Sequence, residues 1–477
     1  MGEETSPCFF LPRLFMPVSF MAGWIAIHTL ARGQPSGTTT HFPVPNGLWA
    51  PRMPTPQVAT TTIDTAAFSK GALQVVTHLQ RAGFEAYVVG GAIRDLLLGA
   101  NPKDFDVATN ATPEEIKQTF RNARIIGRRF QIVHVRSGGE IIEVTTFRGN
   151  HDTGQTTQAA RASQSGRLLR DNVYGTLEED ALRRDLSINA LYYDTTSHQL
   201  LDFLDGAADI TARLIRVIGN PADRYTEDPV RMLRVVRFAA RLGFDLERDT
   251  ETAIAETRHL LADIPAARLF DEWLKLFMNG FSEPTFMLLS HFDLLTSLMG
   301  DDIDISMAQQ RSLELQRMAL GNTDKRVADG RPVTPAFLLA ALYWPAVAHR
   351  CAALTAQGET PIQAMHSAGQ QIVQQACRRL TVPKRFSLAM RDIWDLQPRL
   401  ERMQAKKVRD LLAHRWFRAA FDLLLLREQT SDMTSLCSEF WEQQQAKHPE
   451  LVGSARGQRE QPPGRGRGRR RRRPSSP

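Results

Sequence analysis

The sequence predicts an α+β fold in which a mixed part of strands and helices precedes a long helical part. Between about residues 66 and 215, short β-branched runs alternate with helical patterns, and helical patterns then dominate to about residue 445. The length of 477 residues allows two to four domains, and the 42% apolar content supports a sizeable core. We therefore expect an extension over 1–65, a mixed domain over 66–215, helical domains over 216–280 and 281–448, and a tail over 449–477.

The N-terminal extension has the composition of a linker. Gly, Thr and Pro cluster between Gln34 and Gln57. The apolar run from Leu14 to Ile27 contains Pro17, follows two acidic residues and is too short to span a bilayer, which argues against a signal peptide. The four cysteines show no metal-ligand spacing. We expect a cytoplasmic monomer with free thiols and no membrane insertion.

The net charge of the chain resides in its C-terminal tail. The whole chain carries +7, and residues 450–477 hold nine arginines against two glutamates, which is also +7. Such a segment cannot bury a core and is expected to be disordered. It suits non-specific binding to nucleic-acid phosphates, although a solubilising tail would have the same composition. The arginines expected to bind are Arg465, Arg467, Arg469, Arg470, Arg471, Arg472 and Arg473.

A glycine pair marks the most informative stretch of the chain. Ala86–Val89 predicts a short buried strand that ends at Gly90 and Gly91, where the missing side chains let a ligand approach the backbone. A helix should follow, end at Gly99 and carry Arg94, whose guanidinium is suited to meet a phosphate bidentately. The glycine patterns of dinucleotide-binding and P-loop proteins do not occur, which argues against NAD enzymes and P-loop ATPases.

Two aspartates follow this helix. Asp104 and Asp106 flank Phe105 in a second predicted strand, whose period of two places both carboxylates on one face. An isolated Asp-x-Asp is usually a solvated strand edge. Beside a phosphate-facing arginine, however, two hard oxygen ligands suit Mg²⁺, which completes its shell with water and phosphate oxygens. The stretch therefore predicts a site for a nucleoside triphosphate and its magnesium.

An alternating run predicts a further strand with an acidic residue. The run extends from Glu140 to Phe147, and Glu143 should face the same way as Ile141 and Thr145. Glu143 is then either an edge charge or a third metal ligand.

A capping box predicts the next helix. Thr176 and Glu179 form the box, and the helix should run from about Leu177 to Tyr193. On this helix Asp185 and Asn189 would share a face, with Arg184 about 100° away. A salt-bridged surface helix would show the same pattern.

A third helix is apolar but carries two arginines. Asp228 as N-cap and Pro229 at the first helical position predict its start, and Gly243 predicts its end. Arg231 and Arg234 share a face of this mostly apolar helix, so we expect them to be partly buried and to need partners.

Taken in order, these segments resemble the nucleotidyltransferase class that contains bacterial poly(A) polymerases and CCA-adding enzymes and is distantly similar to DNA polymerase β. The resemblance spans about residues 66 to 425 and rests on four motifs, which are Tyr87–Thr109, Ile141–Arg148, Glu178–Leu191 and Glu227–Arg234. It implies a polymerase-β-like head, a helical neck that recognises the nucleotide and a helical body that binds RNA.

The resemblance also implies roles for single residues. Asp104, Asp106 and Glu143 would hold two Mg²⁺ ions, and Asp185 would join the two aspartates in the catalytic centre. Asp228, Arg231 and Arg234, together with Glu227, would read the base. The implied nucleotide-binding set is completed by Gly90, Gly91, Arg94, Arg148, Arg184 and Asn189.

The implied reaction is template-independent extension of RNA 3′ ends, in which ATP donates AMP and pyrophosphate leaves. The segment Ile125–Val135, which contains Arg128 and Arg129, resembles a pattern typical of bacterial poly(A) polymerases and favours polyadenylation over CCA addition to tRNA. Without that resemblance it is a basic turn between two strands. A catalytically inactive RNA-binding module is the third interpretation, and the intact aspartate pair argues against it.

Overall fold

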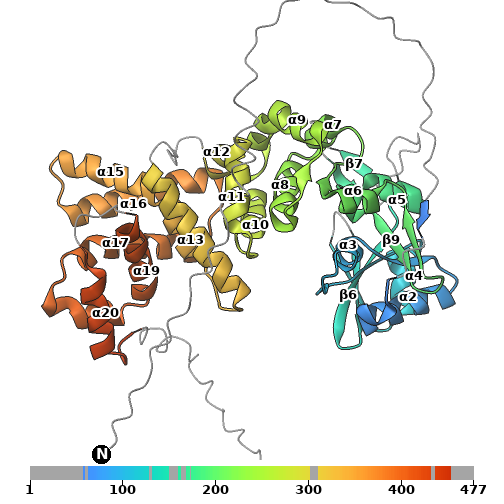
Figure 1. Cartoon of the computed structure of the whole chain (residues 1–477), viewed down its shortest axis with the longest axis horizontal. Coiled ribbons are helices and arrows are strands. Elements are labelled where there is room, and N and C mark those ends of the chain that lie inside the picture. The colour runs from blue at the N-terminus through green and yellow to red at the C-terminus, as the bar shows by residue number, and fades with distance from the viewer. Residues whose placement is uncertain are drawn as a thin grey trace, which may run out of the picture. The chain divides into compact units, whose positions relative to one another are not determined.

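The computed structural model describes residues 57–59, 63–127, 131–149, 160–162, 168–171, 173–300, 310–430 and 436–452. Within these ranges a mixed α/β part precedes a helical part, as predicted (Figure 1). The mixed part is built on an eight-stranded sheet of described strands with the order β1-β10-β9-β2-β3-β6-β5-β4. These strands are β1 (Gln57–Ala59), β2 (Ala86–Val89), β3 (Asp106–Thr109), β4 (Ala123–Ile126), β5 (Ile132–Ser137), β6 (Glu140–Thr146), β9 (Leu191–Asp194) and β10 (Gln199–Asp202).

The centre of the sheet combines one parallel and several antiparallel pairings. β3 runs parallel to β6 and antiparallel to β2, which in turn runs antiparallel to β9. Strand alternation directs Val88, Val107 and Val144 into the core cluster that α2 (Lys70–Arg81) joins through Val75 and Val76. The other face contributes to a second buried cluster with Ala108, Phe147 and Tyr192, which α5 (Leu177–Arg183) joins through Leu177.

The predicted strand–glycine–helix unit is confirmed. β2 passes into α3 (Gly91–Leu97) through Gly90, whose φ of +82° and ψ of −135° a side chain would strain. Gly99, with φ of +73°, follows the end of α3.

The second predicted strand is shorter than expected. β3 begins at Asp106, so Asp104 lies before it in an exposed loop segment. The physical reason is the pairing with β2, in which Asp106 is opposite Val89. Because β2 ends there and turns into α3, it offers no partner to residues before Asp106.

The predicted helix from Leu177 to Tyr193 is wrong in its second half. The capping box is present, but α5 ends at Arg183, and a 3₁₀ turn, η2 (Ser187–Asn189), precedes β9. Residues 191–194 pair with both β2 and β10, and Leu186 forms an isolated bridge with Val217. Long-range strand pairing has therefore overridden the local helical pattern.

The second part of the described chain is helical. Its N-terminal helices are α7 (Pro221–Glu227), α8 (Val230–Leu242), α9 (Arg248–Thr257), α10 (Ala266–Phe277), α11 (Ser282–His291) and α12 (Leu294–Met299). They are followed by α13 (Gln310–Ala328), α14 (Pro335–Leu342), α15 (Trp344–Ala356), α16 (Pro361–Arg379), α17 (Lys384–Glu401), α18 (Val408–Ala413), α19 (Phe417–Gln429) and α20 (Ser438–Lys447).

The predicted start of α8 needs a correction. Asp228 is the C-cap of α7, and Pro229 is the N-cap of α8, so two helices meet where one start was expected. The Asp228 side chain still accepts a hydrogen bond from Val230 N at 3.4 Å. Gly243 ends α8 with φ of +64°, as predicted.

The predicted domain boundary at residue 215 falls within a strand, and that strand pairs with a segment on the other side of the boundary. β11 (Leu214–Ile215) runs parallel to β12 (Asp245–Leu246), and one hydrophobic cluster includes residues from Ile63 to Trp441. The domain boundaries therefore stay predictions. Within the described chain no single helix has the length and apolarity to cross a membrane, although the bent pair α14 and α15 passes the test by length and composition.

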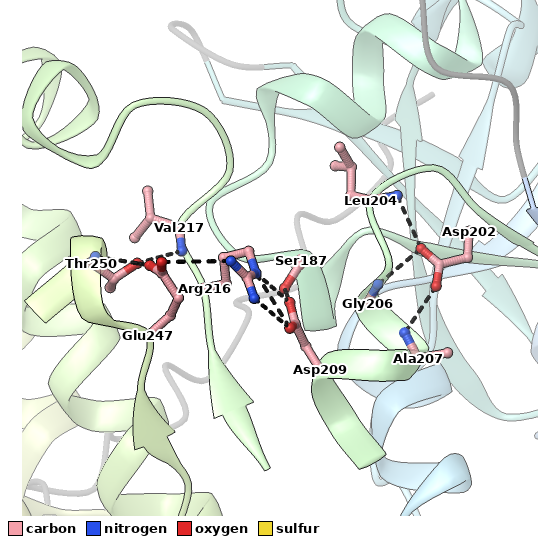
Figure 2. Close-up of polar contacts among 10 residues, drawn as sticks. All are labelled: Ser187, Asp202, Leu204, Gly206, Ala207, Asp209, Arg216, Val217, Glu247 and Thr250. Atoms are coloured by element: carbon pink, nitrogen blue, oxygen red, sulfur yellow. Dashed lines mark hydrogen bonds and ion pairs between the residues drawn. The ribbon is translucent and has the colours of Figure 1, made fainter. Parts of the chain in front are cut away.

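A polar network links the turn η2 to residues that follow it in the chain (Figure 2). Asp209, on α6 (Gly206–Ala212), accepts hydrogen bonds from the Ser187 hydroxyl at 2.5 Å and from Arg216 Nε at 3.1 Å. The guanidinium of Arg216 also lies 3.6 Å from Glu247, which caps α9 by accepting from Thr250 N at 2.9 Å. The network thus joins η2, α6 and α9.

The close packing of Gly206 against Ser187 yields a test. A β-carbon at Gly206 would lie 2.3 Å from the backbone oxygen of Ser187, which cannot yield without displacing η2. We expect Gly206→Ala to lower the free energy of unfolding by about 1–3 kcal/mol, measured by urea unfolding.

Gly321→Ala is the matched control. A β-carbon there meets only the far end of the Glu283 side chain, and alanine favours the interior of α13 by about 1 kcal/mol. Equal stability of the two variants would contradict the role of Gly206.

Candidate active site

A polar cleft of about 430 Å³ lies between the sheet of the head and the helices α7, α8 and α10. Its lining is unusual in charge, because seven arginines face seven carboxylates. The arginines are Arg148, Arg183, Arg184, Arg224, Arg231, Arg234 and Arg268. The carboxylates are Asp106, Glu143, Asp180, Asp185, Glu227, Asp228 and Glu272.

Two carboxylates form one wall of the cleft. Asp106 and Glu143 are direct neighbours in the parallel pairing of β3 and β6. The Glu143 carboxylate also lies 3.2 Å from His134 Nε2 on β5. Desolvation within the cleft raises the pKa of the Asp106 carboxyl to about 6, with further contributions from Glu143 and Asp104 that Arg184 only partly offsets. The raised pKa thus reflects mainly the loss of solvent around Asp106, with the neighbouring carboxylates adding to it.

This wall fits a divalent cation by its donor chemistry. Asp106 and Glu143 offer hard oxygen atoms, and Mg²⁺ usually takes one or two protein carboxylates. Asp104 is near enough to raise the pKa of Asp106 but does not line the cleft. Among the described residues no three acidic, His or Cys side chains converge into a closed metal site. The two-metal assignment to Asp104, Asp106 and Glu143 stays a prediction.

Arg184 is held in a buried network. Its guanidinium lies 2.9 Å from Asp180 Oδ2 and donates to the Tyr192 hydroxyl at 2.8 Å, and that hydroxyl donates to Asp180 at 2.6 Å. The other oxygen of Asp180 accepts from Arg148 N at 3.1 Å. Burial alone would lower the pKa of Arg184, but Tyr192 and Asp180 raise it overall. Arg184 thus stays charged at the cleft.

Asp185 connects the head to α8. One oxygen accepts from Arg234 Nε at 2.7 Å, and the other accepts from Leu186 N at 2.9 Å and from Asn189 Nδ2 at 3.4 Å. Burial alone would raise the pKa of Asp185, but Arg234 and these hydrogen bonds lower it overall. Asp185 and Asn189 therefore meet, as expected, but through the turn η2 instead of a shared helix face.

Arg94 lies behind the cleft. It is 2% exposed, its Nη1 donates to Asn189 Oδ1 at 2.6 Å, and its Nη2 lies 2.6 Å from Asp95. Neither Arg94 nor Gly90, Gly91 or Asn189 lines the cleft. The predicted contact of Arg94 with a phosphate stays a prediction, since this conformation commits the guanidinium to protein partners.

The helices α7 and α8 supply the opposite wall. Glu227 lies 2.9 Å from Arg224 Nη1 and 3.3 Å from Arg231 Nη1, and Asp228 lies 2.7 Å from Arg268 Nη2. Arg224 Nε is buried and has no hydrogen bond within the described chain, whereas Arg231 Nη1, also without a hydrogen bond, makes the ion pair with Glu227. Of these two donors, only Arg224 Nε is left without an acceptor in this conformation.

The sequence did not single out several residues of the cleft, namely Asp180, Arg183, Arg224, Arg268 and Glu272. Asp180 and Arg183 lie inside a quoted motif, but only the fold shows that they face the cleft. The expected RNA-binding arginines Arg128 and Arg129, and those of the tail from Arg465 to Arg473, lie outside the described residues.

Three family models match the chain. "Poly A polymerase head domain" matches residues 86–216, "Probable RNA and SrmB- binding site of polymerase A" matches residues 243–301, and "Polymerase A arginine-rich C-terminus" matches residues 357–476.

Curated relatives point the same way. The Poly(A) polymerase I of Salmonella typhimurium is 44% identical over 388 residues, which cover 80% of this chain and 83% of that protein. The Poly(A) polymerase I of Haemophilus influenzae is 44% identical over 389 residues, which cover 80% of this chain and 86% of that protein. A CCA-adding enzyme of Ligilactobacillus salivarius is 43% identical over 210 residues, or 44% of this chain and 50% of that protein.

A solved structure confirms the fold. The CCA-adding enzyme of Bacillus stearothermophilus in complex with CTP aligns with a TM-score of 0.54 and 26% identity, over 80% of this chain and 82% of that one. The predicted polymerase-β-like head with a helical continuation is thus confirmed. The chain is a nucleotidyltransferase and belongs to the poly(A) polymerase I family.

Proposed function

We propose that this protein extends RNA 3′ ends by transferring AMP from ATP to the terminal 3′-hydroxyl, with release of pyrophosphate and without a template. The observation that carries the proposal is the Asp106–Glu143 wall, which faces an arginine-lined cleft in a chain 44% identical to poly(A) polymerases I. Carboxylates for a cation and guanidinium groups for a triphosphate are the parts that nucleotidyl transfer needs.

Asp106 and Glu143, with Asp104 beside them, would hold magnesium. Bound there, the ion supplies Lewis-acid activation of the 3′-hydroxyl and neutralises charge on the leaving pyrophosphate. Arg184 and Arg148 lie on the same side of the cleft and would contact the phosphates. Because the Asp180 network already orients Arg184, little reorganisation is needed when the triphosphate binds.

The opposite wall would read the base. Ion pairs hold all three side chains in place: Arg231 pairs with Glu227, Asp228 with Arg268, and Arg234 with Asp185. Such paired groups can match the edge of adenine and leave a wrong base with unsatisfied polar atoms. Asn189 and Arg94, which do not line the cleft, would act on the nucleotide through Asp185, and Gly90 and Gly91 would act through the turn that places Arg94.

CCA addition is the second candidate, because CCA-adding enzymes match about half of this chain and share its fold. An enzyme that adds CCA would incorporate CTP and would stop after adding three nucleotides. The intact acidic wall argues against an inactive RNA-binding module.

The acceptor is proposed to be RNA in the cytoplasm, bound by a monomer. The arginine-rich tail and the turn with Arg128 and Arg129 would contact the RNA backbone through sequence-independent charge. Cys351, Cys377 and Cys437 form no disulfide bond among the described residues, which is compatible with a reducing compartment.

The double substitution Asp104→Ala/Asp106→Ala tests the acidic wall. We expect incorporation of labelled AMP into RNA to fall by about a thousandfold or more, because the cation loses its ligands. Circular dichroism should show a folded protein with an unchanged thermal midpoint or a higher one.

The double substitution Asp245→Ala/Asp249→Ala, which removes two exposed carboxylates outside the cleft, is the control and should keep full activity. Persistent AMP transfer by the Asp104→Ala/Asp106→Ala protein would contradict the assignment.

The raised pKa of Asp106 predicts a pH-dependent magnesium response. The pKa of the Asp106 carboxyl is higher in the folded protein than in the unfolded chain, so the folded state favours the protonated form. The free energy of unfolding of the metal-free protein therefore falls as the pH rises from the unfolded pKa to about 6. Mg²⁺ should therefore raise the melting temperature at pH 7, and its apparent affinity should fall about tenfold by pH 5, as protons compete for the ligand.

Without Mg²⁺, Asp106→Asn should melt at a higher temperature than the unsubstituted protein at pH 7, and Mg²⁺ should add little. Asp410→Asn, at an exposed carboxylate on α18, should respond like the unsubstituted protein. An equal magnesium shift in all three proteins, followed by differential scanning fluorimetry, would place the ion elsewhere.

A further inference from the structure

A second large cavity lies in the helical body, apart from the candidate active site. It has a volume of about 550 Å³ and lies between the C-terminal half of α13, the segment 329–337 and α19. α13 and α19 pack together here (Figure 1). None of its lining residues belongs to the cleft described above.

The cavity carries a surplus of positive charge. Five cations line it, namely Lys325, Arg326, Arg331, Arg415 and Arg418, against two carboxylates, Asp329 and Asp422. The candidate active site, in contrast, balances its arginines with as many carboxylates. Lys325 is exposed and lines the cavity near the C-terminal end of α13. The surplus favours an anionic ligand that brings no metal ion of its own.

The walls of the cavity offer aromatic and apolar surface. Phe337 and Trp416 line it together with Leu425, and the guanidinium of Arg415 lies 5.7 Å from the centroid of the Trp416 ring. The Nε1 donor of Trp416 is buried and has no partner in the described part of the chain. The wall therefore offers ring surface to a ligand, whereas this donor is enclosed by protein atoms in the present conformation.

One acceptor lies beside these donors. Asp422 receives a hydrogen bond from Arg418 Nε at 3.1 Å, and burial raises the pKa of its carboxyl against the influence of Arg418 and Arg326. A planar heterocycle with donors and acceptors at its edge, attached to a phosphate, matches this combination of groups.

We propose that this cavity binds a nucleotide unit of single-stranded RNA, with a phosphate on the cations and the base against Trp416 and Phe337. It is a second RNA contact on the body, separate from the site of nucleotidyl transfer. The residues that line the cavity indicate a ligand with both a base and a phosphate. That this ligand is part of an RNA strand rests on the proposed function.

The test is RNA binding by the full chain carrying Lys325→Gln/Arg331→Gln. Both side chains are exposed and make at most the 3.8 Å contact between Arg331 and Asp329, so the fold should persist. We expect the Kd for a fluorescent oligoadenylate 20-mer to rise roughly tenfold at 0.1 M salt, and the salt slope of log K to shrink by roughly 1.4. AMP addition at saturating RNA should stay unchanged.

Lys406→Gln/Lys407→Gln is the matched control, because it removes two exposed positive charges outside the cavity. It should leave affinity and slope near those of the unsubstituted protein. If both double substitutions weaken RNA binding equally, overall positive charge explains the effect and the proposal is wrong. The proposal is also wrong if neither double substitution changes the Kd.

Cross-linking separates direct contact from an indirect effect. Ultraviolet irradiation with 4-thiouridine-containing RNA should attach RNA to the peptide that carries Trp416, and excess unlabelled oligoadenylate should suppress the adduct. If AMP alone suppresses it equally well, the cavity takes free nucleotides and the assignment to an RNA strand is wrong. Weaker RNA binding by the Lys325→Gln/Arg331→Gln protein would support this RNA contact even if the unsubstituted protein transferred no AMP. The outcome for this proposal is therefore independent of the outcome for the proposed function.

Discussion

The ion pair between Asp185 and Arg234 is the constraint on which the rest of the site depends. It joins the turn after α5 to α8 across 49 positions of the chain. Asp185 also accepts a hydrogen bond from the Asn189 side chain, and the Asn189 side-chain oxygen accepts one from Arg94 on α3. One chain of contacts therefore runs from the glycine turn before α3 to α8. Breaking it would leave the mostly buried Asp185 carboxylate with hydrogen bonds from Leu186 N and Asn189 alone, which would destabilise the turn η2. The contact lies in the cleft itself, where it links the residues after α5 to the wall that α8 supplies.

The balance of charge in the cleft has a functional consequence. Seven arginines inside a cleft would repel one another, and each carboxylate partner allows them to stay charged and ordered without a ligand. A triphosphate then meets donors that are already oriented, such as Arg184, and does not have to order them. The acidic wall at Asp106 differs, because desolvation and the neighbouring Glu143 raise the pKa of the Asp106 carboxyl more than Arg184 lowers it. The cleft thus offers arginines that can bind a polyanion and carboxylates that can bind a cation.

Local patterns predicted the parts of the fold that local interactions determine. The strand before Gly90, the shared face of Ile141, Glu143 and Thr145, and the capping box of α5 all follow from neighbouring residues. The helix predicted through Tyr193 failed because β9 pairs with strands distant in sequence, and no periodic signal reports such pairing. The same limit hid Asp180, whose role depends on Tyr192 and Arg148 being brought to it by the fold. Arg94 faces Asn189, a partner 95 positions away, for the same reason.

The most direct test of the account is nucleotide choice by the purified protein. Labelled RNA and tRNA ending in CC or lacking CCA would each be offered ATP, CTP, GTP or UTP separately, and the products resolved by length. The account predicts long homopolymer tails from ATP on arbitrary RNA, and little or no incorporation of CTP. Addition that depends on CTP, prefers tRNA and stops after three nucleotides would contradict it.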